Sequence, residues 1–90
     1  MNRTEILHTA DALINGDRQR EYGDARKMFG LLSGYWSAHL DHPVSASDVA
    51  VMMTLLKIAR AKASPQHEDS YVDAAAYVAL AGELATETSA

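Results

Sequence analysis

Residues 46–63 read ASDVAVMMTLLKIARAKA, and residues 71–85 read YVDAAAYVALAGELA. Apolar residues recur in both segments at the three- and four-residue spacing of a helix face. The polar residues 64–68 between them include Pro65, which favours a turn over a continuing helix. Because this connection is short, we expect two antiparallel helices that pack against each other.

The expected ends of the helices follow from capping residues. Ser45 and Asp48 resemble a capping box, so the first of these two helices should begin near Ala46, and Asp69 or Ser70 should cap the second. Two further helices are expected before them, one from an N-cap at Thr4 to Gly16 and one over residues 25–40. The sequence thus predicts a single all-α domain over residues 1–90, with about four helices and the antiparallel hairpin packed on two N-terminal helices.

Composition narrows the possible functions. The chain has 90 residues, no cysteine and a net charge of −4. A chain this short buries a thin core, so we expect it to form a homo-oligomer. The negative charge and the lack of a long basic run argue against binding to duplex nucleic acid, and no apolar run is long enough to span a membrane. We therefore expect a soluble protein.

Charged residues fall within the apolar faces of the two hairpin helices. At 100° per residue, Arg60 lies near the centre of the apolar arc of its helix and Lys57 at the edge, while Asp73 lies inside the arc of the second helix. With the middle of the turn between residues 66 and 67, Arg60 should face Asp73, and Lys57 should face Ala76 and Tyr77. One interpretation is a buried salt bridge that fixes the register of the hairpin.

The same residues also suit a phosphate ligand. Lys57 and Arg60 would contact phosphate oxygens. Asp69, Asp73 and Tyr77 repeat at intervals of four residues on one helix face, and the two carboxylates would bind Mg²⁺ that keeps several waters. This interpretation makes Asp69 and Asp73 metal ligands and Tyr77 part of a substrate site.

The stretch GDRQREYGD, residues 16–24, is the second candidate part of a site. Arg18 and Tyr22 share a face if the segment turns helically, and they suit a nucleotide, because tyrosine stacks on a base while arginine reaches a phosphate. The alternative is a surface turn between a stop glycine and a helix cap. Both alternatives remain open from these residues.

Three motifs together, R-x-x-x-Y-G-D, K-x-x-R and D-S-x-x-D-x-x-x-Y, resemble a group of small phage and prophage proteins of unassigned function over nearly the whole chain. That group in turn resembles compact MazG-like, all-α nucleoside triphosphate pyrophosphohydrolases. The resemblance implies a helical oligomer in the bacterial host cytoplasm that uses Mg²⁺ to cleave a nucleotide into a monophosphate and pyrophosphate.

Carried onto this chain, the resemblance assigns Asp69 and Asp73 as the acidic pair that is catalytic and binds metal. It assigns Lys57 and Arg60 as phosphate-facing cations. The E-E-x-x-E signature of these enzymes is absent, and D-x-x-x-D replaces their E-x-x-D. The missing carboxylates are ligands that would position metals and activate water, which puts catalysis in doubt.

Three hypotheses follow. The first is a nucleotide-phosphate site at Arg18, Tyr22, Lys57, Arg60, Asp69, Asp73 and Tyr77, acting as a Mg²⁺-dependent pyrophosphohydrolase. The second is a nucleotide-binding protein that sequesters its ligand without catalysis. The third is a protein interaction module whose salt-bridge cluster is purely structural.

Overall fold

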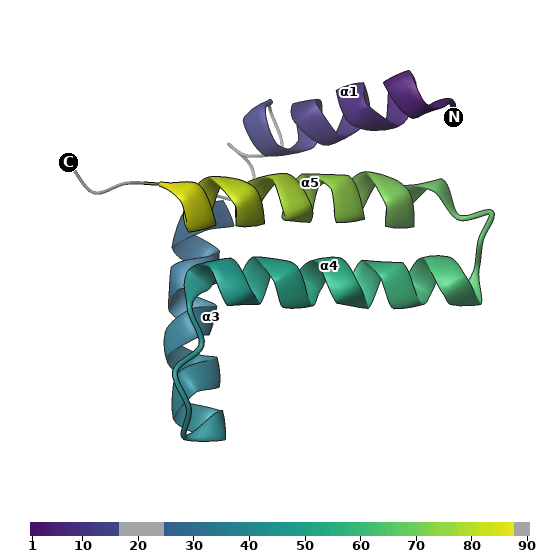
Figure 1. Cartoon of the computed structure of the whole chain (residues 1–90). Helices are drawn as coiled ribbons and strands as arrows, with labels where there is room; N and C mark the ends of the chain where they lie inside the picture. Colours follow the sequence, from purple (N-terminus) through teal and green to yellow (C-terminus); the bar gives the residue numbers. More distant parts are fainter. Residues whose placement is uncertain (17–24, 88–90) are drawn as a thin grey trace.

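The computed structural model describes residues 1–16 and 25–87, and within these ranges all regular structure is helical. Helix α1 spans Arg3–Asn15, α3 spans Ala25–Leu40, α4 spans Ala46–Ala63 and α5 spans Glu68–Thr86. Figure 1 shows these helices coloured in the order of the chain. The all-α class and the four helices expected from the sequence are confirmed for the described residues.

The expected hairpin is the centre of the structure. Helices α4 and α5 lie side by side and run in opposite directions, joined by the short turn after Ala63 (Figure 1). Helix α1 lies along the face of α5 that points away from α4, and α3 runs across the end of the hairpin where α4 begins and α5 ends. Helix α5 therefore lies between α1 and α4.

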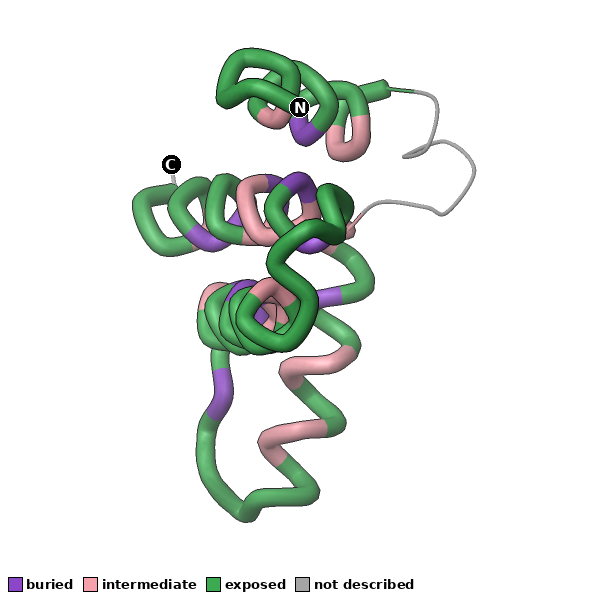
Figure 2. The backbone as a smooth tube through the Cα atoms, turned by 90° about the vertical axis from the view of Figure 1, so that its right-hand side faces the viewer, coloured by how far each residue is buried: buried purple, intermediate pink, exposed green. Residues whose placement is uncertain are grey.

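Buried side chains form two small clusters, one on each side of α5. The larger cluster joins α3, α4 and α5 and includes Phe29, Val49 and Leu80. The smaller cluster joins α1 to α5 through Ala10, Val72 and Ala76. Figure 2 shows that buried residues lie where helices face each other, while most of the outer surface is exposed.

The N-terminus of α4 agrees with the sequence prediction. The Ser45 side chain accepts a hydrogen bond from the Asp48 backbone N–H at 2.9 Å, and the Asp48 carboxylate accepts one from the Ser45 backbone N–H at 3.0 Å. This capping box satisfies two N–H groups that the helix itself leaves free. The predicted start at Ala46 and end at Ala63 are both confirmed.

The other two predicted N-caps were wrong. Helix α1 is capped by Asn2 rather than Thr4, because Asn2 and Glu5 form a reciprocal capping box at 2.8 and 3.0 Å. Helix α5 begins at Glu68, so Asp69 and Ser70 lie inside its first turn instead of capping it. Acidic residues in a first turn interact favourably with the positive end of the helix dipole, which accounts for the earlier start.

Helix α3 ends in a left-handed residue. Asp41 has a φ of 52°, the His42 backbone N–H donates to the Ser37 carbonyl at 3.1 Å, and the Asp41 N–H donates to Ala38 at 3.4 Å. This pair of hydrogen bonds is the Schellman pattern that commonly terminates a helix. Ser37 Oγ then accepts from the Val44 N–H at 2.8 Å, which holds the following loop against α3.

The hydrophobic content is spread over helix surfaces and not concentrated in one long segment. Thirteen large apolar or aromatic side chains of the described residues are exposed, five of them on α4 alone. No helix among the described residues is long and apolar enough to cross a membrane.

Candidate functional site

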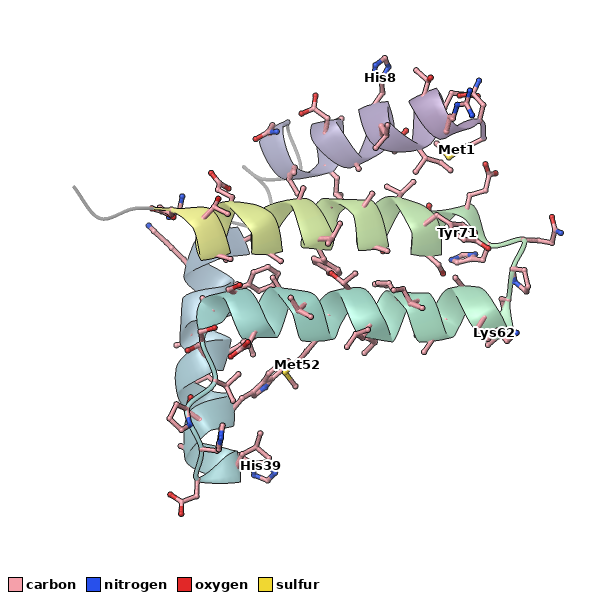
Figure 3. All side chains as sticks on the ribbon, viewed as in Figure 1. Met1, His8, His39, Met52, Lys62 and Tyr71 are labelled. Atoms are coloured by element: carbon pink, nitrogen blue, oxygen red, sulfur yellow. The ribbon has the colours of Figure 1, made fainter. Side chains whose placement is uncertain are left out.

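A cleft with a volume of about 640 Å³ lies between α1, the start of α3 and α5. Most of its lining is apolar, from Ala12 to Ile14 on α1, from the first turns of α3 and from the middle of α5. In Figure 3 the side chains of α1 and α5 point toward each other on the two sides of this space. The polar side chains that line the cleft are Thr9, Asp69, Asp73 and Tyr77.

Three of these polar side chains come from α5 at four-residue intervals. Asp69, Asp73 and Tyr77 all line the cleft, so the helix face expected from their spacing is confirmed. Asp69 is exposed, whereas Asp73 and Tyr77 are half-buried. The Tyr77 ring packs on the Phe29 ring with a centroid distance of 5.8 Å and a tilt of 58°, which fixes its position at the α3 end of the cleft.

Asp73 is paired with Lys57 instead of Arg60. The Lys57 Nζ atom lies 3.0 Å from Asp73 Oδ2, and the two side chains are 20% and 26% exposed. The prediction that Arg60 faces Asp73 was wrong, because the hairpin pairs residues around position 65, the mean of 57 and 73, and not around 66.5. The early start of α5 at Glu68 shortens the turn and shifts the register.

Arg60 does not lie in the buried face of α4. Its side chain is exposed and does not line the cleft. Lys57 also stays outside the cleft lining and reaches it only through its partner Asp73. The sequence pattern predicted Arg60 at the centre of the covered apolar face of α4. Because this helix is apolar on nearly all sides, the pattern alone did not show which side is covered.

The site residues Arg18 and Tyr22 lie outside the described residues. Their assignment to a substrate site stays a prediction, as do the roles assigned to Lys57, Arg60 and the residues of the cleft wall. The described part of the chain contains no group of three His, Cys, Asp or Glu side chains close enough to hold a metal ion. Any metal bound at Asp69 and Asp73 would therefore take most of its ligands from water or from the ligand itself.

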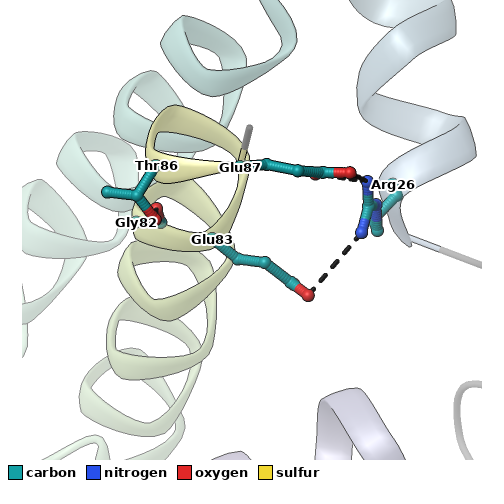
Figure 4. A network of polar contacts seen from close by, with 5 residues as sticks. All are labelled: Arg26, Gly82, Glu83, Thr86 and Glu87. Carbon is teal, nitrogen blue, oxygen red and sulfur yellow. Dashed lines mark hydrogen bonds and ion pairs between the residues drawn. The ribbon is translucent and has the colours of Figure 1, made fainter. Parts of the chain in front are cut away.

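Two polar contacts that tie the ends of the helices were not predicted. Arg26 of α3 contacts Glu87 at 2.5 Å and Glu83 at 3.6 Å near the end of α5, as Figure 4 shows. At the other end of α5, the Met1 amino group binds Glu68, and this hydrogen bond raises the pKa of the amino group. These contacts join residues 57 to 67 positions apart, so no local spacing in the sequence indicates them.

The comparisons with known proteins support the phage part of the resemblance. Residues 5–85 match the family described as "Domain of unknown function (DUF6378)". The chain is 42% identical over 72 residues to the "Gene 55 protein" of Mycobacterium phage D29, and 42% identical over 76 residues to the "Gene 55 protein" of Mycobacterium phage L5. No solved structure matches the chain.

The matches cover 80% and 83% of this chain but 48% and 49% of the two phage proteins, so the chain spans about half the length of these curated relatives. A relationship to MazG-like enzymes is not among these findings and stays a prediction. Because the family match extends over residues 5–85, the chain belongs to the DUF6378 family of unknown function and is related to proteins of mycobacterial phages.

Proposed function

We propose that the protein binds a nucleotide in the cleft between α1 and α5, with the phosphates at the end marked by Asp69 and Asp73. The observation that carries this proposal is the shared wall of Asp69, Asp73 and Tyr77 in a cleft of about 640 Å³. Clefts of roughly 300–1,000 Å³ with an apolar lining and a few polar groups are typical of small-molecule sites. The apolar lining would cover the base and sugar.

The charges in the cleft decide how phosphate would bind. Two carboxylates repel a bare phosphate, so a divalent cation between them is needed for attraction. Mg²⁺ suits this position, since it commonly takes one or two carboxylates, several waters and phosphate oxygens. Asp73 Oδ2 is bound to Lys57, which leaves its other oxygen and the exposed Asp69 carboxylate for the cation.

Binding is the form of the proposal with the most support, and catalysis is its extension. In the enzymatic form, Mg²⁺ would supply an activated water for attack on the α or β phosphorus of a nucleoside triphosphate, with pyrophosphate as a product. The described residues offer two carboxylates at the cleft and no group of three metal-binding side chains. A non-catalytic protein that sequesters nucleotides needs no further ligands.

The first test is thermal unfolding with nucleoside mono-, di- and triphosphates, with and without Mg²⁺. We expect triphosphates to raise the Tm only when Mg²⁺ is present, because a ligand that binds the folded state stabilises it by mass action. No change in Tm at millimolar nucleotide with Mg²⁺ would refute the proposal. Pyrophosphate release in the same samples distinguishes the enzyme from the binding protein.

Variants at exposed acidic residues test whether the ligand binds next to Asp69. Asp69→Asn should weaken Mg²⁺-dependent binding by about tenfold or more, because a charge-assisted contact contributes roughly 1.5–3 kcal/mol. Asp69 is exposed and makes no hydrogen bond or ion pair with the other described residues, so the fold should persist. Asp41→Asn is the matched control, since it removes the same charge at an exposed position that does not line the cleft.

A protein interaction module is the second candidate. It is favoured by the exposed apolar side chains of α4, which a nucleotide in the cleft leaves uncovered. The two candidates are compatible, because the cleft lies on the α1 side of α5 and α4 lies on the other side.

A further inference from the structure

The outer face of α4, which points away from α5, is apolar and uncovered. Its large side chains are between 42% and 57% exposed. At 100° per residue they share an arc of about 160°. A monomeric soluble protein rarely leaves one helix this apolar on its free side. The outer face of α4 consists of Val51, Met52, Leu55, Leu56 and Ile58.

Two opposite charges flank this face symmetrically. Asp48 lies seven residues before Leu55, and Lys62 lies seven residues after it. Seven residues make about two helical turns, so all three side chains point to nearly the same side of α4. Both charged side chains are exposed. Along the helix, the face therefore has an acidic residue at one end, apolar residues in the middle and a basic residue at the other end. A second copy of the helix running antiparallel would place its basic end against the acidic end of the first.

We propose that the outer face of α4 is the interface of a symmetric dimer, in which α4 of a second copy lies antiparallel with the two Leu55 side chains near the twofold axis. A twofold interface uses the same patch on both copies, so each contact occurs twice. In this register Asp48 faces the partner's Lys62, and Lys62 faces the partner's Asp48. Only one oxygen of Asp48 is used by the capping box, which leaves the other for this contact.

The surface area of the chain supports a second copy. Its accessible surface is 6473 Å² for a mass of 9.8 kDa. A folded monomer of that mass exposes about 5200 Å² on the usual scaling, so the excess is about 1300 Å². A stable interface of standard size buries about 800 Å² on each partner. The excess, summed over the whole chain, is larger than one such interface needs, and the position of the interface rests on the apolar outer face of α4 and its flanking charges.

Sedimentation equilibrium of the full chain tests the dimer and its location. Leu55→Lys places two like charges opposite each other at the axis and should raise the dimer Kd by at least about 100-fold. Val78→Lys is the matched control, because Val78 is an equally exposed apolar residue on α5 outside this face, and its Kd should equal that of the wild type. Circular dichroism should show the same helix content in both variants.

The antiparallel register has its own test. Lys62→Glu should weaken the dimer, because it sets two acids against each other, and the double variant Asp48→Lys with Lys62→Glu should restore it. Because the chain has no cysteine, Leu55→Cys also gives a clean probe, and mild oxidation should yield a covalent dimer that Val78→Cys does not form.

Three results would overturn the proposal. The first is a wild-type chain that stays monomeric at the highest soluble concentration, which would leave the face to another protein. The second is a dimer with an unchanged Kd in Leu55→Lys. The third is a failure of the double charge reversal to restore the Kd while its helix content matches the wild type, which would exclude this register.

Discussion

Lys57 of α4 and Asp73 of α5 meet at 3.0 Å between Nζ and Oδ2, and this ion pair links the two helices of the hairpin. The pair is half-buried, and the Asp73 carboxylate also lines the cleft between α5 and α1. One carboxylate thus belongs both to the hairpin and to the candidate site. Its structural and its ligand-binding contributions need separate measurements.

Replacing Asp73 with Asn should lower the free energy of unfolding by about 1–2 kcal/mol. This value lies between the roughly 0–1 kcal/mol of an exposed ion pair and the roughly 3–5 kcal/mol lost when a fully buried pair is broken. The Lys57 side chain is 20% exposed, so its amino group can turn toward water when Asp73 is replaced. Urea unfolding of Asp73→Asn, Lys57→Met and the double variant gives the coupling energy. Asp69→Asn removes an exposed first-turn carboxylate of α5 but no ion pair, so it should lower stability by only about 0.5 kcal/mol.

A coupling energy near zero would show that the pair does not fix the hairpin. A loss above about 3 kcal/mol would show that Lys57 is more deeply buried in solution than in this structure.

Gly34, in the middle of α3, should be replaceable by Ala with a gain in stability of about 1 kcal/mol. A Cβ built at Gly34 meets nothing within 4 Å, and glycine inside a helix costs roughly this much relative to alanine. Thermal unfolding of the purified variant measures the gain.

Gly16→Ala is the contrasting variant. A Cβ there would lie 2.4 Å from the Ala12 carbonyl oxygen, so the end of α1 must shift and stability should fall. If both glycines respond alike, the backbone at the end of α1 differs from the one described.

Asp41→Gly should stabilise the protein by about 0.5–1 kcal/mol. Asp41 has a φ of 52°, a conformation that costs energy for a residue with a side chain and little for glycine. Asp41→Val, with a β-branched side chain, should destabilise the protein instead. Equal stabilities of the two variants in urea would contradict the left-handed end of α3.

Local patterns predicted the helices well where the signal lies in adjacent residues. The capping box at Ser45 and Asp48 indicated the start of α4. At α5 two neighbouring candidates, Asp69 and Ser70, were both wrong, because the helix begins at Glu68 with His67 at the N-cap position and no side-chain capping bond. This error of a few residues moved the register of the hairpin by about one and a half positions.

The site followed from the sequence only in part. The four-residue spacing brought Asp69, Asp73 and Tyr77 to one cleft wall as expected. The partner of Asp73 was assigned incorrectly, because it depends on the turn geometry and not on the pattern of either helix. The covered side of α4 could not be predicted either, since both of its sides are apolar.

Variants at two valines of α4 distinguish the contribution of the core to stability from that of the proposed interface. Val49 is fully buried against α3 and α5, so Val49→Ala should lower the free energy of unfolding by about 2–3 kcal/mol at any protein concentration. Val51 is 44% exposed on the outer face of α4, so in a monomer Val51→Ala should cost less than about 0.5 kcal/mol.

The dimer changes the expectation for Val51 alone. Binding of a second copy stabilises the folded state by mass action, so the Tm of the wild type should rise with protein concentration. Val51→Ala weakens the interface, so its Tm deficit should widen as concentration increases, while the deficit of Val49→Ala stays constant. Calorimetry over a hundredfold range of concentration measures both deficits. Parallel deficits for the two variants would place Val51 outside any interface and would count against an α4-mediated dimer.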